Sequence, residues 1–347
     1  MARTTFLIAA LAASAPAAAF GYGEAGETKQ SLEERALHLH TDRLRVDPGA
    51  ADEQFDDRPA VRPLIQAEEL ATAARFYADD MAANGCFPAD HSSCDGTSFS
   101  SRLQSFYDGS PFGENIAKGQ GTAEMAVFQS WLYSDGHRAN MLDGDWNEIG
   151  TGYPGDASDN IWVQDFGFRA STPEPIVTSA IHLPLYPAED RTTEFVAAVF
   201  DPDGTSLRAM TLVAEEECTF MEPDLGSGGM ETWSTEASTG PAGCVRYWFA
   251  ALRDNGEEVA YPTEGSLVVP VGGAACEAWV PERVRATCAP PTFTGSGAGC
   301  GGSGAGYGPD ATVGTNAEYG TCAQGGSRGG AGLAWLVGLL LVGRRRR

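Results

Sequence analysis

Three ionisable side chains stand in separate short polar segments where they have no obvious packing role. His91 lies in His91-Ser92-Ser93, Glu114 follows a glycine in Gly113-Glu114-Asn115, and His137 follows another in Gly136-His137-Arg138. Imidazole and carboxylate groups are those that most often bind metal ions or transfer protons in proteins. We expect His91, Glu114 and His137 to converge on one cleft.

Three kinds of chemistry fit these residue types. Two neutral imidazoles can bind Zn²⁺ or another divalent cation at about 2.0–2.1 Å each, with Glu114 as a ligand or as the group that orients a histidine. Alternatively, Glu114 could be a base and a serine a nucleophile, although Ser134 lies only three residues from His137 and no Ser/His/Asp order stands out. In the third interpretation the cluster is structural, with Glu114 accepting backbone N–H bonds. The residues alone leave all three open.

Helical periodicity predicts elements that flank His91. Ser31-Leu32-Glu33-Glu34 is a capping box, so a helix should run from about residue 32 to 45. A second helix should end at Asn84-Gly85, just before the loop that holds His91. Its helical repeat is formed by Leu70, Ala74, Tyr77 and Met81.

A third helix and two strands should follow Glu114. Thr122 caps the helix and Gly136 ends it, so that His137 comes directly after the helix. The buried side of this helix consists of Met125, Phe128, Trp131 and Leu132. Strands are expected at 148–153 and 160–168. Helices that flank a small antiparallel sheet predict an α-β-α layered domain over residues 31–170 and an α+β chain.

This part of the chain resembles the CAP superfamily in its bacterial form. The superfamily includes cysteine-rich secretory proteins, venom antigens and plant pathogenesis-related proteins. The resemblance is carried, in chain order, by Ala73 to Asn84 with His91, Gly113 to Ala117, Trp131-x-x-Ser134, Gly136 to Leu142, and Glu148 to Tyr153.

The resemblance implies a cleft with two histidines and two glutamates. By motif match His91 and His137 are the histidines, and Glu114 is the first glutamate. Ser134 stands three residues after Trp131, where many eukaryotic members carry the second glutamate. The site therefore has one carboxylate fewer for acid–base chemistry, which favours a binding site over a hydrolase.

Beyond Thr172-Pro173-Glu174-Pro175, short β-like runs between turns replace the helical periodicity. Two clear turns are Asp201-Pro202-Asp203-Gly204 and Arg253-Asp254-Asn255-Gly256. Strands at this spacing predict an all-β sandwich of immunoglobulin-like or fibronectin-like build over residues 174–289. No cluster of catalytic residue types stands out in it.

The N-terminus indicates export. Residues 1–19 have a basic start, a short apolar run and small residues near Ala19, as in a signal peptide. The run is far shorter than the roughly 20 residues that span a bilayer. Export makes the eight cysteines disulfide candidates. Proximity in the sequence predicts the pairs Cys86–Cys94, Cys218–Cys244 and Cys276–Cys288, and leaves Cys300 and Cys322 in glycine-rich sequence.

The C-terminus indicates a tether. Residues 290–330 form a Gly/Ser-rich linker, and residues 331–347 combine a short apolar segment with four arginines. This order resembles the C-terminal sorting tags of myxobacterial surface proteins, which implies processing or lipid modification at Cys322. We expect attachment to the cell-envelope membrane, or secretion after removal of the tail.

The charge and the site together define the expected function. Lys+Arg 23 against Asp+Glu 47 gives a net charge of −24, which excludes nucleic acid as a partner. We predict a non-enzymatic, envelope-tethered protein that binds a small-molecule or lipid-like ligand, a cell-surface component or a divalent cation. The residues assigned to ligand binding are His91, Glu114, Ser134 and His137. The alternatives are an extracellular metal-dependent or serine hydrolase, and an adhesion protein that uses the β-sandwich.

Overall fold

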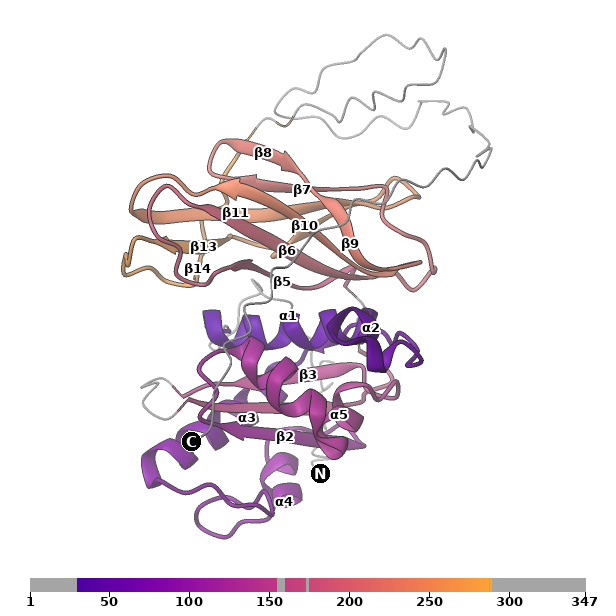
Figure 1. Cartoon of the computed structure of the whole chain (residues 1–347), viewed down its shortest axis with the longest axis vertical. Helices are drawn as coiled ribbons and strands as arrows, with labels where there is room; N and C mark the ends of the chain where they lie inside the picture. Colours follow the sequence, from indigo (N-terminus) through magenta and orange to yellow (C-terminus); the bar gives the residue numbers. More distant parts are fainter. Residues whose placement is uncertain (1–29, 155–159, 173–174, 287, 289–347) are drawn as a thin grey trace, which may run out of the picture. The chain divides into compact units, whose positions relative to one another are not determined.

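The computed structural model describes residues 30–154, 160–172, 175–286 and 288. The predicted signal peptide, linker and tail, with Cys300 and Cys322, lie outside the described residues. Helices and one sheet fill the described part up to Gly167, and strands fill the part beyond it (Figure 1). The mixed helix and strand content that the sequence predicts is confirmed. None of the helices in these ranges is long and apolar enough to cross a bilayer.

The part up to Gly167 has a mixed order of short and long elements. In chain order they are α1 (Leu32–Val46), α2 (Pro48–Ala51), η1 (Glu53–Phe55), β1 (Ile65–Gln66), α3 (Glu68–Asn84), α4 (Phe99–Gln104), β2 (Phe112–Lys118), η2 (Met125–Ser130), η3 (Trp131–Tyr133), α5 (Asp135–Met141), β3 (Glu148–Gly152) and β4 (Ile161–Gly167). The strands form one sheet in the order β1-β3-β4-β2. Only the β1–β3 pair is parallel among these strands.

Helices cover both faces of this sheet. A Cβ at Gly150 would lie 2.0 Å from the carbonyl carbon of Leu70, so β3 touches the backbone of α3 there. The neighbouring Thr151 points to the opposite face, where its hydroxyl donates to the backbone oxygen of Glu34 in α1 at 3.1 Å. Since successive side chains of a strand point to opposite faces, α3 and α1 lie on opposite sides of β3.

The sequence signals at the start of α1 and at the end of α3 form the capping contacts and the turn that the sequence predicts. The Ser31 hydroxyl accepts a hydrogen bond from the Glu34 N–H, and the Glu34 carboxylate accepts one from the Ser31 N–H, which completes the capping box of α1. α3 ends at Gly85, whose φ of 62° lies in the left-handed region that glycine adopts without strain.

The prediction for the third helix was wrong in two respects. Thr122 does cap it, accepting from the Met125 N–H at 3.1 Å, but η2 is a π-helical segment whose wider turn buries Ala126 and Val127. Met125 is therefore 38% exposed instead of buried. The helix is interrupted at Ser134, which is extended (φ −103°, ψ 118°), so Gly136 lies in the first turn of α5 and does not end a helix.

The remaining described residues form two β-sheets. Their strands are β5 (Val177–Leu183), β6 (Thr192–Phe200), β7 (Ala209–Ala214), β8 (Glu217–Phe220), β9 (Glu222–Ser227), β10 (Met230–Ser238), β11 (Gly243–Leu252), β12 (Glu258–Tyr261), β13 (Ser266–Val271) and β14 (Trp279–Val280). One sheet has the order β5-β6-β10-β9; the other has β14-β13-β11-β7-β8, with β12 paired to β11. Phe195 and Trp233 of the first sheet share one buried core with Tyr247 and Leu267 of the second. The immunoglobulin-like or fibronectin-like build stays a prediction.

Two of the three predicted disulfides were wrong. Cys86–Cys94 forms as predicted, within the loop before α4. Cys218 pairs with Cys288, and Cys244 pairs with Cys276. Strands that are neighbours in a sheet can be far apart in the chain, so proximity in the sequence is a poor guide there. In this protein Cys244 at the start of β11 lies opposite Pro270 of β13, and Cys276 follows β13 closely.

α1 is buried on both sides. Its Asp42 carboxylate accepts from the Leu64 N–H at 2.8 Å and from the hydroxyl groups of Ser179 and Thr178 on β5 at 2.7 and 3.1 Å. Residues of α1 also share one apolar cluster with residues of β5 and β6: Leu37, Leu39, Ile181, Val196 and Ala198. The helix thus packs between the mixed sheet and the first sheet of the β part.

Buried histidines make the folded state sensitive to acid. Burial, together with the charge of Arg43, lowers the pKa of His40 to about 3. The unfolded chain takes up this proton near pH 6.5, so it binds more protons than the folded chain below that pH, and stability falls as the pH falls towards 3. His40→Gln should reduce the stability loss between pH 7 and pH 5 by about 2 kcal/mol, measured by urea unfolding at both pH values. Equal losses in both proteins would contradict this assignment.

Candidate functional site

The centre of the polar cluster is a hydrogen bond between the side chains of His91 and Glu114. Glu114 lies on β2 with its side chain 1% exposed, and its Oε1 is 2.8 Å from Nδ1 of His91. His91 stands in the loop after α3 with a φ of 61°, a left-handed conformation that is uncommon for a residue with a side chain. Its ring is 28% exposed. The buried carboxylate therefore holds an accessible imidazole in a fixed orientation.

Arg102 of α4 fixes the other side of Glu114. Its Nη2 lies 2.5 Å from Glu114 Oε2, and its Nη1 donates to the backbone oxygen of His91 at 2.9 Å. The guanidinium also lies over the Tyr77 ring of α3, 3.5 Å from the centroid. The same buried arginine thus binds both members of the His91–Glu114 pair. No sequence pattern marks Arg102, because a position three residues after Phe99 is that of an ordinary helix-surface residue.

A second carboxyl group lies beside Glu114. Asp165 of β4 is paired in register with Glu114 of β2, so the two side chains share one face of the sheet. Asp165 is completely buried, and neither of its oxygens has a hydrogen-bond donor among the described residues. Burial, and then the charge and hydrogen bonding of Glu114, raise the pKa of Asp165 well above its usual value. The buried Asp165 carboxyl therefore favours its protonated, neutral form.

This protonation predicts a specific response to Asp165→Asn. A neutral amide can replace a neutral acid, and it removes the cost of taking up a proton on folding. The variant should be as stable as the wild type or more stable at pH 7. That advantage should vanish as the pH falls towards 4, where Asp165 is protonated in the unfolded chain as well. Urea unfolding at pH 7 and pH 4 measures the difference, and Asp165→Ala controls for lost packing. A strongly destabilised Asn variant at pH 7 would show that Asp165 is ionised.

His137 lies on α5, which a network of amide side chains ties to β2. Asn140 Nδ2 donates to the backbone oxygen of Glu114 at 3.1 Å and to Asn115 Oδ1 at 3.0 Å. Asn115 Nδ2 in turn donates to the backbone oxygen of His137 at 3.1 Å. Burial and the neighbouring His91 lower the pKa of His137, so its imidazole is neutral at physiological pH. Its Nδ1 is buried without a hydrogen-bond partner in the described part of the chain.

Ser134 stands apart from this network. It occupies the N-cap position of α5, but its side chain makes no capping hydrogen bond. The backbone N–H of Ser134 donates to the backbone oxygen of Trp131, and the backbone oxygen of Ser134 accepts from the N–H of Arg138. In the described ranges, no hydrogen bond of His91, Glu114 or Arg102 involves Ser134. The structure thus brings His91 and Glu114 into contact, places His137 near His91, and adds Arg102 and Asp165.

The side chains of His91, Glu114 and His137 could bind a metal ion in only one arrangement. The side chains of His91, Glu114 and His137 do not place three ligand atoms within 4.8 Å of one another. Within the described ranges only Asp80, Cys86 and Cys94 place three such atoms that close together. Those two cysteines form a disulfide with each other. Both oxygens of Glu114 are engaged, by His91 and by Arg102. Because His91 turns Nδ1 to Glu114, its Nε2 is the ring atom left to bind a cation. A cation bound here would have the two imidazoles as ligands and Glu114 as the orienting group.

The part of the chain that holds this polar cluster is similar to CAP-family proteins. Residues 58–166 match the family model described as CAP, Cysteine-rich secretory protein family. The uncharacterized protein YkwD of Bacillus subtilis (strain 168) is 38% identical over 110 residues, which is 31% of this chain and 41% of that protein. The chain thus matches about two fifths of the length of this relative.

Two solved structures are similar to part of this chain. The crystal structure of an extracellular protein containing a SCP domain from Bacillus anthracis str. Ames is 25% identical, with a TM-score of 0.31. The match covers 39% of this chain and 41% of that chain. An outer surface protein from Borrelia burgdorferi is 22% identical with a TM-score of 0.30, over 38% of this chain and 90% of that chain.

Proposed function

We propose that the chain is an exported protein whose CAP domain binds a divalent cation such as Zn²⁺, without catalysing a reaction. His91 and His137 supply the ligand atoms, and Glu114 orients His91. The observation that carries the proposal is that Glu114 is locked between His91 and Arg102. A carboxylate held in this way strengthens an imidazole ligand, but it is not free to act as the base of a hydrolase.

Location and partners follow from the whole sequence. The signal-peptide-like N-terminus and three disulfides fit an oxidising compartment outside the cytoplasm. The Gly/Ser-rich linker and arginine-ended tail would keep the protein at the cell envelope, with Cys322 as the modified residue. There the cation site would face a small-molecule or lipid-like ligand or another cell-surface component, which can complete the coordination of the bound cation.

Zinc titration of the mature chain tests this function. Calorimetry should give a Zn²⁺ affinity that falls at least tenfold in His91→Ala and in His137→Ala, because each removes one of two ligands. Glu114→Gln should cost about 10–100-fold, the usual effect of losing an orienting partner. Mg²⁺ is the control cation, since it prefers oxygen ligands and would report only weak binding to the acidic surface. Unchanged Zn²⁺ affinity in the His91→Ala/His137→Ala double variant would refute the cation site. Hydrolytic turnover that is lost in the same variants would favour an enzyme.

A further inference from the structure

The last described segment of the chain forms a belt across the second sheet of the β part. The belt consists of residues 281–286 and 288 and follows β14, which pairs with β13 at one edge of the sheet. Its end, Cys288, forms a disulfide with Cys218 of β8. β14 and β8 are the opposite ends of the strand order β14-β13-β11-β7-β8. The belt therefore joins the two edges of this sheet.

The length of the belt requires a direct path. Four strand spacings of about 4.8 Å separate β14 from β8, so the sheet is about 19 Å wide between them. The eight residues from Val280 to Cys288 reach at most about 29 Å. A segment with so little slack has to lie across the strands between the two edges.

The belt lies on the outer face of the sheet. Tyr247 and Phe249 of β11 belong to the core between the two sheets, so Trp248 points to the opposite face. Trp248 Nε1 donates to the backbone oxygen of Val284 in the belt at 3.0 Å, and the Arg283 guanidinium lies 4.9 Å from the centroid of the Trp248 ring. Val284 is buried, so the belt packs against the strands that it crosses.

Without the disulfide, a pull on the chain beyond Cys288 would peel the belt from its end. The contacts on the path are local: the Val284 N–H donates to the Ser266 hydroxyl at 3.1 Å, and Arg283 Nε donates to the Gly265 oxygen at 3.0 Å. β14 would follow, because only two of its residues pair with β13. Short terminal segments of this kind open at the lowest cost in free energy.

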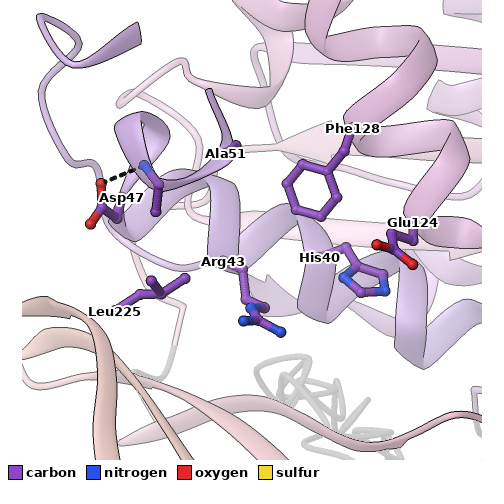
Figure 2. Close-up of a pocket in the computed structure, with 8 residues that line it drawn as sticks. His40, Arg43, Asp47, Ala51, Glu124, Phe128 and Leu225 are labelled. Carbon is purple, nitrogen blue, oxygen red and sulfur yellow. Dashed lines mark hydrogen bonds between the residues drawn. The ribbon is translucent and has the colours of Figure 1, made fainter. Parts of the chain in front are cut away.

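Peeling would next reach a contact between the β part and α1. Arg35 Nη2 of α1 donates to the backbone oxygen of Ala278 at 3.2 Å, directly before β14. α1 also contacts the first sheet at β9, where Arg43 lies 3.2 Å from Asp224 and lines a pocket of about 320 Å³ together with Leu225 (Figure 2). A force that enters at β14 would therefore act on the edge that α1 contacts.

We propose that the belt and the Cys218–Cys288 disulfide make the β part a load-bearing anchor. Residues 289–347, which include the predicted linker and tail, follow Cys288 in the chain, so a pull from the cell envelope enters the fold there. The disulfide passes that pull covalently to β8, at the edge opposite Ala278. Residues 219–287 lie off the covalent path. The inference rests on the proposed tether and requires no bound cation.

Optical tweezers with handles on the two ends of the full mature chain test the anchor. Wild-type chains should show no short first step. In Cys218→Ala/Cys288→Ala the belt should peel first, at a force at least about twofold below that of any wild-type step. This step should be at most about 40 Å long, because Cys276, which is bound to Cys244, lies twelve residues before Cys288.

The total extension gives a second readout. The Cys218–Cys288 disulfide bypasses 70 residues, and Cys244–Cys276 still closes 32 of them in the variant. The remaining 38 residues should make the fully unfolded variant about 130 Å longer than the wild type. Equal lengths would show that tension does not pass through Cys218–Cys288, which would overturn the proposal.

Cys244→Ala/Cys276→Ala is the matched control. It also removes one disulfide from the second sheet, but that disulfide lies inside the loop that Cys218–Cys288 closes. The control should show no short first step and the extension of the wild type. A low-force first step of equal size in the control, or in the wild type, would overturn the proposal.

Reduction provides a test that needs no folding of the Cys218→Ala/Cys288→Ala variant. Dithiothreitol added to the folded Cys244→Ala/Cys276→Ala protein should cleave Cys218–Cys288 and produce the low-force first step, and its absence after reduction would contradict the proposed load path. These forces are independent of the proposed function: loss of the cation site would appear in the Zn²⁺ titration, and failure of the tether would appear as protein released from cells.

Discussion

Arg102→Ala is expected to lower the free energy of unfolding by about 3–5 kcal/mol, one of the largest effects of any substitution in the part of the chain that holds the polar cluster. Arg102 and Glu114 are each 1% exposed on their side chains, so removal of the guanidinium leaves a carboxylate buried without its strongest partner. The backbone oxygen of His91 loses its donor as well, so the loop that carries His91 should loosen. Urea unfolding measures the stability, and the His91 NMR signals report the loop.

Two comparisons separate the buried charge from general damage. The double variant Arg102→Met/Glu114→Gln removes both charges, and it should recover part of the loss. Arg246→Ala breaks the ion pair with Glu215, in which both side chains are about 40% exposed, and should cost less than about 1 kcal/mol. If Arg102→Ala costs no more than Arg246→Ala, the Arg102–Glu114 pair does not stabilise the cluster.

Gly150→Ala is expected to cost at least about 3 kcal/mol, or to prevent folding. The added methyl carbon would lie 2.0 Å from the carbonyl carbon of Leu70 and 2.2 Å from the nitrogen of Ala71. These are backbone atoms of α3, so the clash cannot be relieved by rotation of a side chain, and the helix would have to move away from the sheet. Thermal unfolding and the near-UV circular dichroism of the folded chain detect the change.

Gly136→Ala is the matched control for this substitution. Gly136 lies in α5, its φ is not in the left-handed region, and a Cβ there would meet nothing within 4 Å. Alanine should therefore be neutral, or stabilise by up to about 1 kcal/mol through its higher helix propensity. A destabilising Gly136→Ala would mean that the glycine does end a helix, as the sequence first indicated.

Helix ends could be predicted because their signals are local. The capping box at Ser31 and the glycine at position 85 act through neighbours within one turn, and each is visible in the sequence. The interruption between η3 and α5 could not be predicted in this way. A glycine at position 136 signals a helix end and is equally compatible with a first helical turn. The π-helical turns of η2 have no comparable local sequence signal.

The polar cluster was predictable only in part. His91, Glu114 and His137 were found from residue types and motif order, and His91 and Glu114 are in contact. Asp165 was missed although it carried a signal, since a charged residue in the otherwise buried strand Ile161–Gly167 requires a partner. Identifying that partner depends on the register between β2 and β4, which brings together residues 51 positions apart and cannot be derived from local patterns.

The burial of α1 on both sides restricts how this chain can vary. Thirteen of its fifteen residues are buried, against seven of seventeen in α3, because α1 faces the mixed sheet on one side and β5 on the other. A substitution in α1 therefore has to suit two packing partners at once, and one in α3 has to suit only one. Over long divergence α1 should accept the fewest replacements of any helix in the described part of the chain. Substitutions on β5 and β6 should occur together with substitutions in α1, so that the part with the mixed sheet and the β part change as a pair.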